Sequence, residues 1–193
     1  MQNNTELQRE ADEAVRVMKA GGIILYPTDT VWGLGCDATN AEAVERIYKL
    51  KRSENKKSML MLCASADMVV RYVNKAPGIA FEVMELATSP LTAILPGAAG
   101  VAENLIPEER TLGVRIPDHE FCRRILRGLG RPVVSTSASI SGEATPAGLA
   151  EVSREIIDGV DFVVNPRFEG KPTKKASSII AFGEGGEVKI IRE

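Results

Sequence analysis

Short apolar runs of strand length alternate with segments of helical periodicity along nearly the whole chain, and no other sequence feature constrains the fold as strongly. The spacing predicts helices over residues 7–18, 40–51, 119–129 and 146–159, and over 66–87 with a break at Pro77-Gly78. Strands are expected at residues 23–26, 59–63, 91–95, 111–116, 132–136 and 161–164, followed by a hairpin of 177–182 with 187–191. Because some strands follow one another without a helix, we expect an α/β fold in one domain of residues 1–193, a twisted mixed β-sheet flanked by helices.

The charges of the chain are almost balanced, with 24 Lys and Arg against 26 Asp and Glu and a net charge of −2. This balance excludes an evenly basic nucleic-acid binder and a protein with an acidic tail. The single histidine, His119, excludes a His-rich metal site, and its position before a predicted helix favours a capping role. Three separated cysteines without a CxxC pair indicate reduced thiols and a cytoplasmic location, and no apolar run is long enough to predict membrane contact.

Familiar nucleotide-binding and hydrolase motifs are missing from the sequence, which has no Walker A loop and no Gly-x-Ser-x-Gly elbow. The stretch Gly33–Ala38 has the loose Gly-x-Gly-x-x-Ala form of a dinucleotide loop. The predicted helix begins only after Asn40, so this pattern lacks the helix that its mechanism requires. Any phosphate-binding site must therefore be assembled from separate segments.

A polar loop follows the first predicted strand, where Thr28 and Thr30 flank Asp29 and Trp32 stands beside Gly33. A β-turn capped by its own side chains would explain Thr-Asp-Thr alone, whereas a tryptophan beside glycines is less typical of a plain turn. Ligands of open α/β sheets bind beyond the carboxyl ends of strands. We therefore expect this loop to contact a ligand.

Six basic residues lie between Arg46 and Lys57, with only Glu54 opposing them in that span. Such a run is by itself most typical of the solvated face of a helix. Because the run leads into the loop before the next predicted strand, its side chains are also suited to phosphates, through charge-assisted hydrogen bonds.

Arg115 lies inside an apolar predicted strand, where a guanidinium is costly to bury without a partner. It is either an edge-strand residue in water or a clamp for a carboxylate or phosphate. Five hydroxyl side chains between Ser135 and Ser141 follow another predicted strand. They either satisfy their own loop or form a cradle for phosphate and ribose oxygens, and the stretch Lys174–Ser178 offers similar groups.

Taken in order, these segments resemble the YrdC-like family, whose enzymes are threonylcarbamoyl-AMP synthases, and the resemblance extends from about Ala11 to Arg192. The family's Pro-Thr-Asp/Glu-Thr-x-Tyr/Trp-Gly-Leu is matched by Pro27–Leu34, and its Val-x-Arg-x-Pro resembles the stretch around Arg115. Its Lys-x-Arg…Lys, Ser-Ala-Asn-x-Ser-Gly and late Ser-Ser/Thr-Ile/Val patterns look like Lys51, Arg52 and Lys57, then residues 137–142, then residues 177–179.

The resemblance implies a nucleotidyltransferase reaction. Members of the family combine L-threonine, bicarbonate and ATP into threonylcarbamoyl-adenylate and pyrophosphate. The product serves the threonylcarbamoyl modification of adenosine in tRNA, which a partner transferase complex completes. Magnesium is expected to accompany the ATP as a cofactor, with no metal site built from protein side chains. Such a reaction requires positioning and neutralised phosphate charge, so the scarcity of histidine is no obstacle.

The resemblance also implies roles for individual residues. Lys51 and Arg52 are expected to be catalytic and to hold the triphosphate, and Arg115 to pair with the threonine carboxylate. The residues expected to bind threonine are Thr28, Thr30, Arg115 and Ser177. The residues expected to bind nucleotide are Lys51, Arg52, Lys57, Thr111, Ser135, Ser137, Ser139 and Thr145.

Three positions depart from the family pattern. Trp32 stands where many members have Tyr, Ser139 replaces the Asn of Ser-Ala-Asn, and the order Lys51-Arg52 requires a one-residue shift. The last two leave open a second hypothesis, a paralogous member without full synthase activity that binds nucleotide, tRNA or double-stranded RNA on a basic concave face. That face would combine the run from Arg46 to Lys57 with Arg123, Arg124, Arg127 and Arg131.

A third hypothesis is a hydrolase with Cys36 or Cys122 as its nucleophile. Among potential bases, only His119 lies near either cysteine in the sequence.

Overall fold

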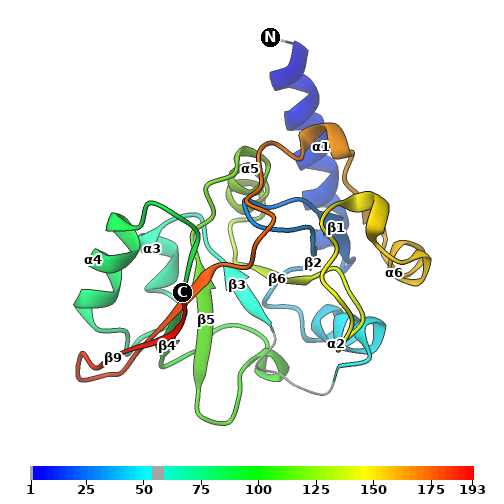
Figure 1. The fold of residues 1–193 in the computed structure, drawn as a ribbon. Coiled ribbons are helices and arrows are strands. Elements are labelled where there is room, and N and C mark those ends of the chain that lie inside the picture. Colours follow the sequence, from blue (N-terminus) through cyan, green and yellow to red (C-terminus); the bar gives the residue numbers. More distant parts are fainter. Residues whose placement is uncertain (1, 54–58) are drawn as a thin grey trace.

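The computed structural model describes residues 2–53 and 59–193, and in this part of the chain nine strands form one mixed sheet (Figure 1). The order across the sheet is β7-β1-β2-β6-β3-β5-β4-β8-β9, with parallel and antiparallel neighbours. The expected α/β class with a mixed sheet flanked by helices is confirmed. The strands are β1 (Ile24–Tyr26), β2 (Gly33–Gly35), β3 (Leu60–Leu62), β4 (Leu91–Pro96), β5 (Thr111–Arg115), β6 (Val133–Ser137), β7 (Phe162–Val163), β8 (Ser178–Phe182) and β9 (Val188–Arg192).

In Figure 1, α3 and α4 lie to the left, towards β4 and β9, and α2 and α6 lie to the right, towards β1 and β2. Their ends follow the expected sequence signals: Asn40 accepts a hydrogen bond from the Ala43 amide at 3.0 Å to cap α2, and His119 caps α5. Gly130 ends α5 in the left-handed region, at φ +70°. The helices are α1 (Gln2–Lys19), α2 (Ala41–Lys51), α3 (Ala66–Val69), α4 (Gly78–Leu86), α5 (Glu120–Leu129) and α6 (Arg154–Gly159), with 3-10 turns η2 (Glu103–Leu105), η3 (Leu149–Glu151) and η4 (Pro166–Phe168).

The strand β2 was not expected from the sequence, because Gly33 and Gly35 are typical of a loop. Here the glycines allow close packing within a sheet. A Cβ on Gly35 would lie 2.6 Å from the Tyr26 ring and 2.9 Å from the Val134 carbonyl oxygen. The buried aromatic ring of β1 therefore occupies the space that a side chain on β2 would fill.

Two helix predictions were wrong in extent. The segment from Pro146 to Gly159 is divided into η3 and α6, because Ser153 caps a new helix by accepting from the Ile156 amide. In the segment 66–87 the break expected at Pro77-Gly78 is confirmed, since α4 begins at Gly78, but α3 is shorter than expected and ends at Val69. The intervening chain pairs Val73 with Ala98 in an isolated β-bridge.

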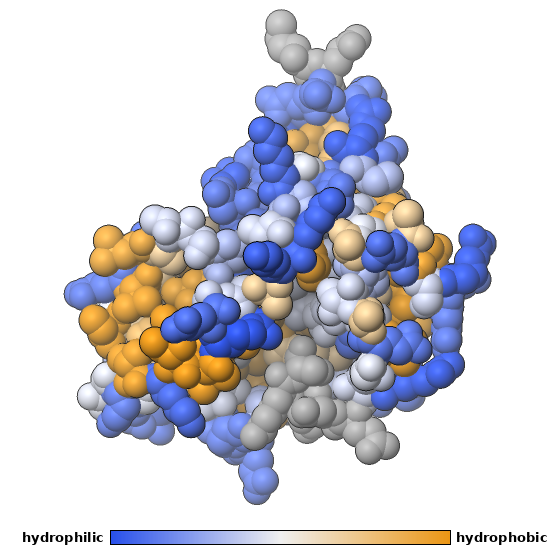
Figure 2. Space-filling view, in the orientation of Figure 1, coloured by the Kyte–Doolittle hydropathy of each residue, from blue (hydrophilic) through white to orange (hydrophobic). Residues whose placement is uncertain are grey.

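An apolar patch, orange in Figure 2, lies over α4 and the β8–β9 hairpin. It lies at the β9 end of the sheet, on the opposite side from α2. No helix of the described residues is long and apolar enough to cross a membrane. The exposed apolar side chains of this region include Ile79, Leu86, Val188, Ile190 and Ile191.

Candidate functional site

One face of the central sheet gathers the hydroxyl and arginine side chains predicted to bind substrates. The register pairs Ser135 with Leu60 and Leu60 with Gly113, and residues paired in this way project to the same face. A Cβ on Gly113 would meet Leu60 and Thr92 at 3.2 and 3.3 Å, so Thr92 lies on this face too. By the two-residue alternation of strands, the face carries Thr92, Thr111, Gly113, Arg115, Ser135 and Ser137.

The loop between β1 and β2 meets Arg115, which is only 3 % exposed, at one part of this face. Arg115 forms a buried ion pair with Asp29, and its Nη2 donates to Thr30 Oγ1 at 3.3 Å. Thr28 Oγ1 and Thr30 Oγ1 lie 3.0 Å apart. The sequence-predicted threonine site thus contains a connected network of two hydroxyls and a guanidinium.

Both carboxylate oxygens of Asp29 accept hydrogen bonds. Its Oδ1 accepts from Arg115 Nη1, and its Oδ2 accepts from the Asp118 amide at 3.1 Å. The charge of Arg115 is therefore already compensated within the chain, while its expected role toward a substrate carboxylate stays a prediction. Sequence reasoning placed Asp29 between two threonines and did not pair it with Arg115.

Lys51 forms the centre of a second part of the site, where its side chain is buried at the end of α2. Its Nζ donates to the carbonyl oxygens of Ser137 and Ser139, both at 2.6 Å, and burial lowers its pKa to about 8. Ser139 thus engages Lys51 through its backbone, so having serine instead of asparagine there leaves this contact intact. Lys51 borders a pocket of about 500 Å³ whose lining includes Arg52, Thr136, Ser137, Ser139, Ser141 and Thr145.

Arg52 follows α2 in the left-handed region at φ +53°. Its guanidinium donates to both carboxylate oxygens of Glu155 on α6, at 2.7 and 2.9 Å. Arg52 therefore lines the pocket of Lys51 while it is paired with an acid from a distant part of the chain. The predicted nucleotide ligand Lys57 lies outside the described residues.

A neighbouring hollow of about 420 Å³ lies over the same sheet face and is lined by Thr111, Gly113, Thr92 and Arg192 among others. Ser177 is held beside it, with its Oγ 2.6 Å from Thr92 Oγ1. Arg192 donates from Nη2 to the Ser177 carbonyl oxygen at 2.7 Å. Sequence reasoning missed Arg192, although a basic residue at the end of an apolar strand is the same signal that drew attention to Arg115.

The basic face expected from the sequence carries less net positive charge than the count of its arginines indicates. Most of its arginines form ion pairs with acids, so the local excess of positive charge is largely compensated among the described residues. The ion pairs are Arg46 with Asp161, Arg52 with Glu155, Arg123 with Asp118 and Glu120, Arg124 with Glu120, and Arg131 with Asp37.

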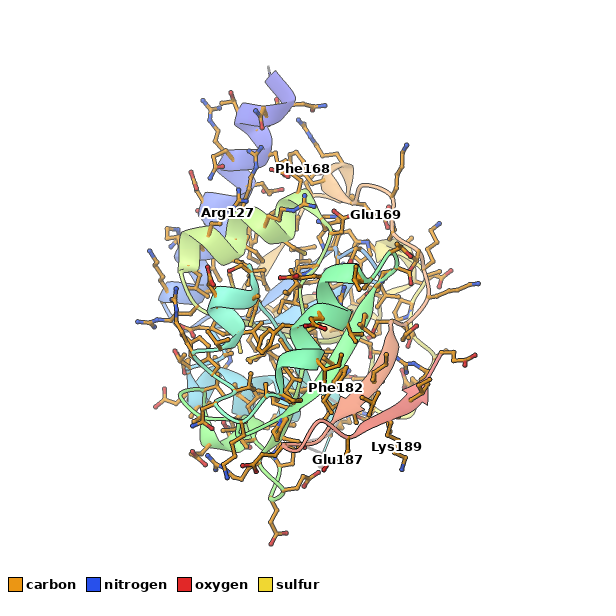
Figure 3. All side chains as sticks on the ribbon, turned by 90° about the vertical axis from the view of Figure 1, so that its left-hand side faces the viewer. Arg127, Phe168, Glu169, Phe182, Glu187 and Lys189 are labelled. Carbon is orange, nitrogen blue, oxygen red and sulfur yellow. The ribbon has the colours of Figure 1, made fainter. Side chains whose placement is uncertain are left out.

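Residues 165–177, which we call the crossing segment, lead from β7 to β8 and are drawn in orange in Figure 1. The amides of Thr173 and Lys174 donate to the carbonyl oxygens of Asp29 and Thr30, both at 2.9 Å. Glu169, labelled beside Phe168 in Figure 3, accepts from Trp32 Nε1 at 2.9 Å. The crossing segment is thereby attached to the loop that contacts Arg115.

His119 also holds the crossing segment, because its Nε2 lies 2.8 Å from the Glu169 carbonyl oxygen. Its Nδ1 accepts from the Cys122 amide, so the proton is assigned to Nε2, and burial lowers the His119 pKa. The capping role expected for His119 is confirmed.

The cysteines lack the surroundings of a nucleophile. Cys36 and Cys122 are buried, and burial raises the pKa of both thiols. Both thiols therefore stay protonated at neutral pH, and the hydrolase hypothesis is contradicted. Among the described residues, no group of three or more His, Cys, Asp and Glu could hold a metal ion.

A family model named Sua5/YciO/YrdC, with the description telomere recombination, matches residues 16–193. The protein named threonylcarbamoyl-AMP synthase from Idiomarina loihiensis is 35 % identical over 158 residues, which is 79 % of this chain and 85 % of the relative.

Escherichia coli YciO, named as an uncharacterised protein, is 31 % identical over 170 residues, 86 % of this chain and 82 % of its own. Its crystal structure matches with a TM-score of 0.82 at 26 % identity, covering 96 % of this chain and 89 % of that one. The crystal structure of P. abyssi Sua5 with L-threonine has a TM-score of 0.82 at 24 % identity and shares the fold. The match covers 91 % of this chain and 51 % of the Sua5 chain, so this chain spans about half the length of that protein.

Proposed function

Because the chain belongs to the Sua5/YciO/YrdC family, we propose that it is a threonylcarbamoyl-AMP synthase. The enzyme joins L-threonine, bicarbonate and ATP into threonylcarbamoyl-AMP, pyrophosphate and water. One observation carries the proposal: a single sheet face bears both the Thr30–Arg115 network and the serine cradle that holds Lys51. An amino acid and a nucleotide can thus be bound within reach of each other.

The first chemical step joins threonine to bicarbonate. The threonine amine attacks the bicarbonate carbon, a C–N bond forms, and water leaves to give the carbamate. Thr28, Thr30 and Ser177 offer hydroxyls for the amino acid, and Arg115 offers its remaining N–H groups to the carboxylate. Their burial fixes the orientation of the amine before the nucleotide reacts.

The second step transfers the adenylate. A carbamate oxygen attacks the α-phosphorus of ATP, and the bond to pyrophosphate breaks. Lys51 and Arg52 compensate the charge on the phosphates, while Ser137, Ser139 and Thr145 line the pocket around them. Thr111, Ser135 and Arg192 offer further polar contacts to the nucleotide from the same sheet face.

Magnesium enters this account as a companion of ATP. The described residues supply no cluster of acids for a protein-built site, and magnesium commonly binds substrate phosphates with few protein ligands. We assign it no step. We also propose that the product passes to a transferase complex that modifies tRNA, and that the protein works in the cytoplasm.

The test is pyrophosphate release by the purified chain. Release is expected only when ATP, threonine and bicarbonate are all present. The variant Arg46→Ala, in which only a surface ion pair with Asp161 is lost, is expected to keep the activity. An absence of threonine-dependent release across a range of magnesium concentrations would contradict the proposal.

A second candidate is a paralogous member that binds RNA without full synthase activity. Its motivation is the 31 % identity to YciO, a family member that is not named as a synthase, together with the departures at Ser139 and Lys51-Arg52. In that case the protein would bind tRNA or double-stranded RNA with an affinity that falls steeply as salt rises, and would release no pyrophosphate. The same purified protein distinguishes the two candidates in parallel assays.

A further inference from the structure

The crossing segment carries three exposed lysines, Lys171, Lys174 and Lys175. Among the described residues, no carboxylate lies within ion-pair distance of any of them. In this they differ from the arginines of the expected basic face, most of which are paired. These lysines therefore add positive charge without acidic partners from a segment that lies outside the basic run of the sequence.

The backbone fixes where two of these lysines stand. The Lys174 amide donates to the Thr30 carbonyl oxygen at 2.9 Å, and Thr30 contacts Arg115 through its side chain. Three residues further on, Ser177 is anchored to Thr92 on the sheet. Lys174 and Lys175 therefore lie on the stretch between the Thr30 loop and the Thr92 strand, at the rim of the face that carries Arg115.

The backbone of Lys174 is held in an uncommon conformation, with φ +59°. A residue with a side chain enters the left-handed region at a cost, which its surroundings must offset. The hydrogen bonds of Thr173 and Lys174 to the Asp29 and Thr30 carbonyls provide that compensation. They hold the backbone of the segment against the Thr30 loop, at the rim of the site.

The charge balance of the site shows what these lysines can bind. Arg115 is neutralised by Asp29, Arg52 is paired with Glu155, and the Lys51 ammonium already donates to two carbonyls. A triphosphate carries several negative charges that these engaged groups compensate only in part. Exposed lysines without acidic partners at the rim are complementary to that excess.

We propose that Lys174 and Lys175 form a cationic rim that binds the phosphates of ATP and holds the pyrophosphate leaving group. The identity of the anion rests on the proposed synthase function. The lysines are binding residues for the phosphates, and they add to the expected contacts of Lys51 and Arg52.

The test is the affinity of the full chain for inorganic pyrophosphate, measured by calorimetry without threonine or bicarbonate. The double variant Lys174→Gln/Lys175→Gln is expected to bind pyrophosphate about tenfold more weakly, and the loss is expected to shrink at high salt. The double Lys→Arg variant is expected to keep the affinity. Lys189→Gln is the matched control, because Lys189 is an exposed lysine of the β8–β9 hairpin that Figure 3 shows well separated from Glu169.

A further variant separates charge from backbone strain. Lys174→Gly removes the charge and suits the left-handed backbone, so it is expected to fold at least as stably as the parent chain and still to bind pyrophosphate less tightly. The proposed phosphate-binding role of Lys174 and Lys175 would be contradicted if the double glutamine variant bound pyrophosphate as tightly as the parent chain. It would also be contradicted if the parent chain showed no measurable affinity for pyrophosphate. The synthase proposal is judged separately, by threonine-dependent turnover.

Discussion

Arginines in two regions of this molecule have opposite surroundings. Arg115 is buried on the central sheet with Asp29 as its partner, whereas Arg46 and Arg52 lie at the surface, paired with Asp161 and Glu155. A buried ion pair depends on both partners because neither charge reaches water, whereas a surface pair contributes little. Removal of one partner is thus expected to be costly for stability at Arg115 and nearly neutral at Arg46 and Arg52.

The largest expected effect is at the buried pair. Arg115→Ala leaves the Asp29 carboxylate buried without its partner and is expected to lower the free energy of unfolding by about 3–5 kcal/mol. Urea denaturation measures the change. The double variant Arg115→Met/Asp29→Asn is the control, since it leaves no uncompensated charge and is expected to recover much of the stability. A loss under 1 kcal/mol in the single variant would contradict the comparison.

Lys51 extends the comparison to a buried cation that forms no ion pair with the acids of the described residues. Lys51→Met leaves the Ser137 and Ser139 carbonyl oxygens without their donor and is expected to cost about 1–3 kcal/mol of unfolding free energy. The exposed Lys49 on the same helix provides the matched control, and Lys49→Met is expected to change stability by less than about 0.5 kcal/mol. Equal effects at the two positions would show that the burial of Lys51 is of no consequence for stability.

The titration of Lys51 gives a pH dependence. Burial lowers its pKa from 10.5 to about 8, so the ammonium that is to face the phosphates loses its proton as pH rises through 8. The KM for ATP is therefore expected to rise above pH 8, by up to about tenfold per pH unit, in steady-state kinetics. Lys51→Arg keeps its charge throughout this range, so a rise of the same steepness in that variant would assign the effect to another group.

The smallest effects are expected at the surface pairs. Arg46→Ala and Arg52→Ala should each change the free energy of unfolding by less than about 1 kcal/mol. The two variants should differ in function. Arg52 lines the pocket that contains Lys51, whereas Arg46 is not part of that lining and is paired with Asp161. Nucleotide binding by calorimetry tests this: weaker binding is expected for Arg52→Ala only, and unchanged binding for both variants would remove Arg52 from the proposed site.

Hydroxyls and basic groups that follow apolar strands can be recognised locally, and the family resemblance joined them into one predicted site. It placed Thr28, Thr30 and Arg115 in one site, and the structure brings them into contact. The ion-pair partner of Arg115 could not be predicted from the sequence. Asp29 lies 86 positions away, and only the strand order brings the two side chains together.

The charge pattern shows the same limit. Counting along the chain found a basic run at Arg46–Lys57, whereas folding brings Asp161 to Arg46 from 115 positions away and Glu155 to Arg52 from 103. Strand β2 was missed for a related reason, because three residues with two glycines carry no periodic signal. Tertiary partners decided both features, and neither is encoded in a local window.

The most direct test of the proposed synthase function follows labelled carbon into the product. The purified chain is incubated with ATP, threonine and ¹³C-bicarbonate, and the adenylates are analysed by mass spectrometry. The proposed function predicts an AMP conjugate that contains threonine and one ¹³C atom, formed together with pyrophosphate and lost when threonine is omitted. An adenylate pool without such a conjugate, from a folded protein that binds ATP, would contradict it.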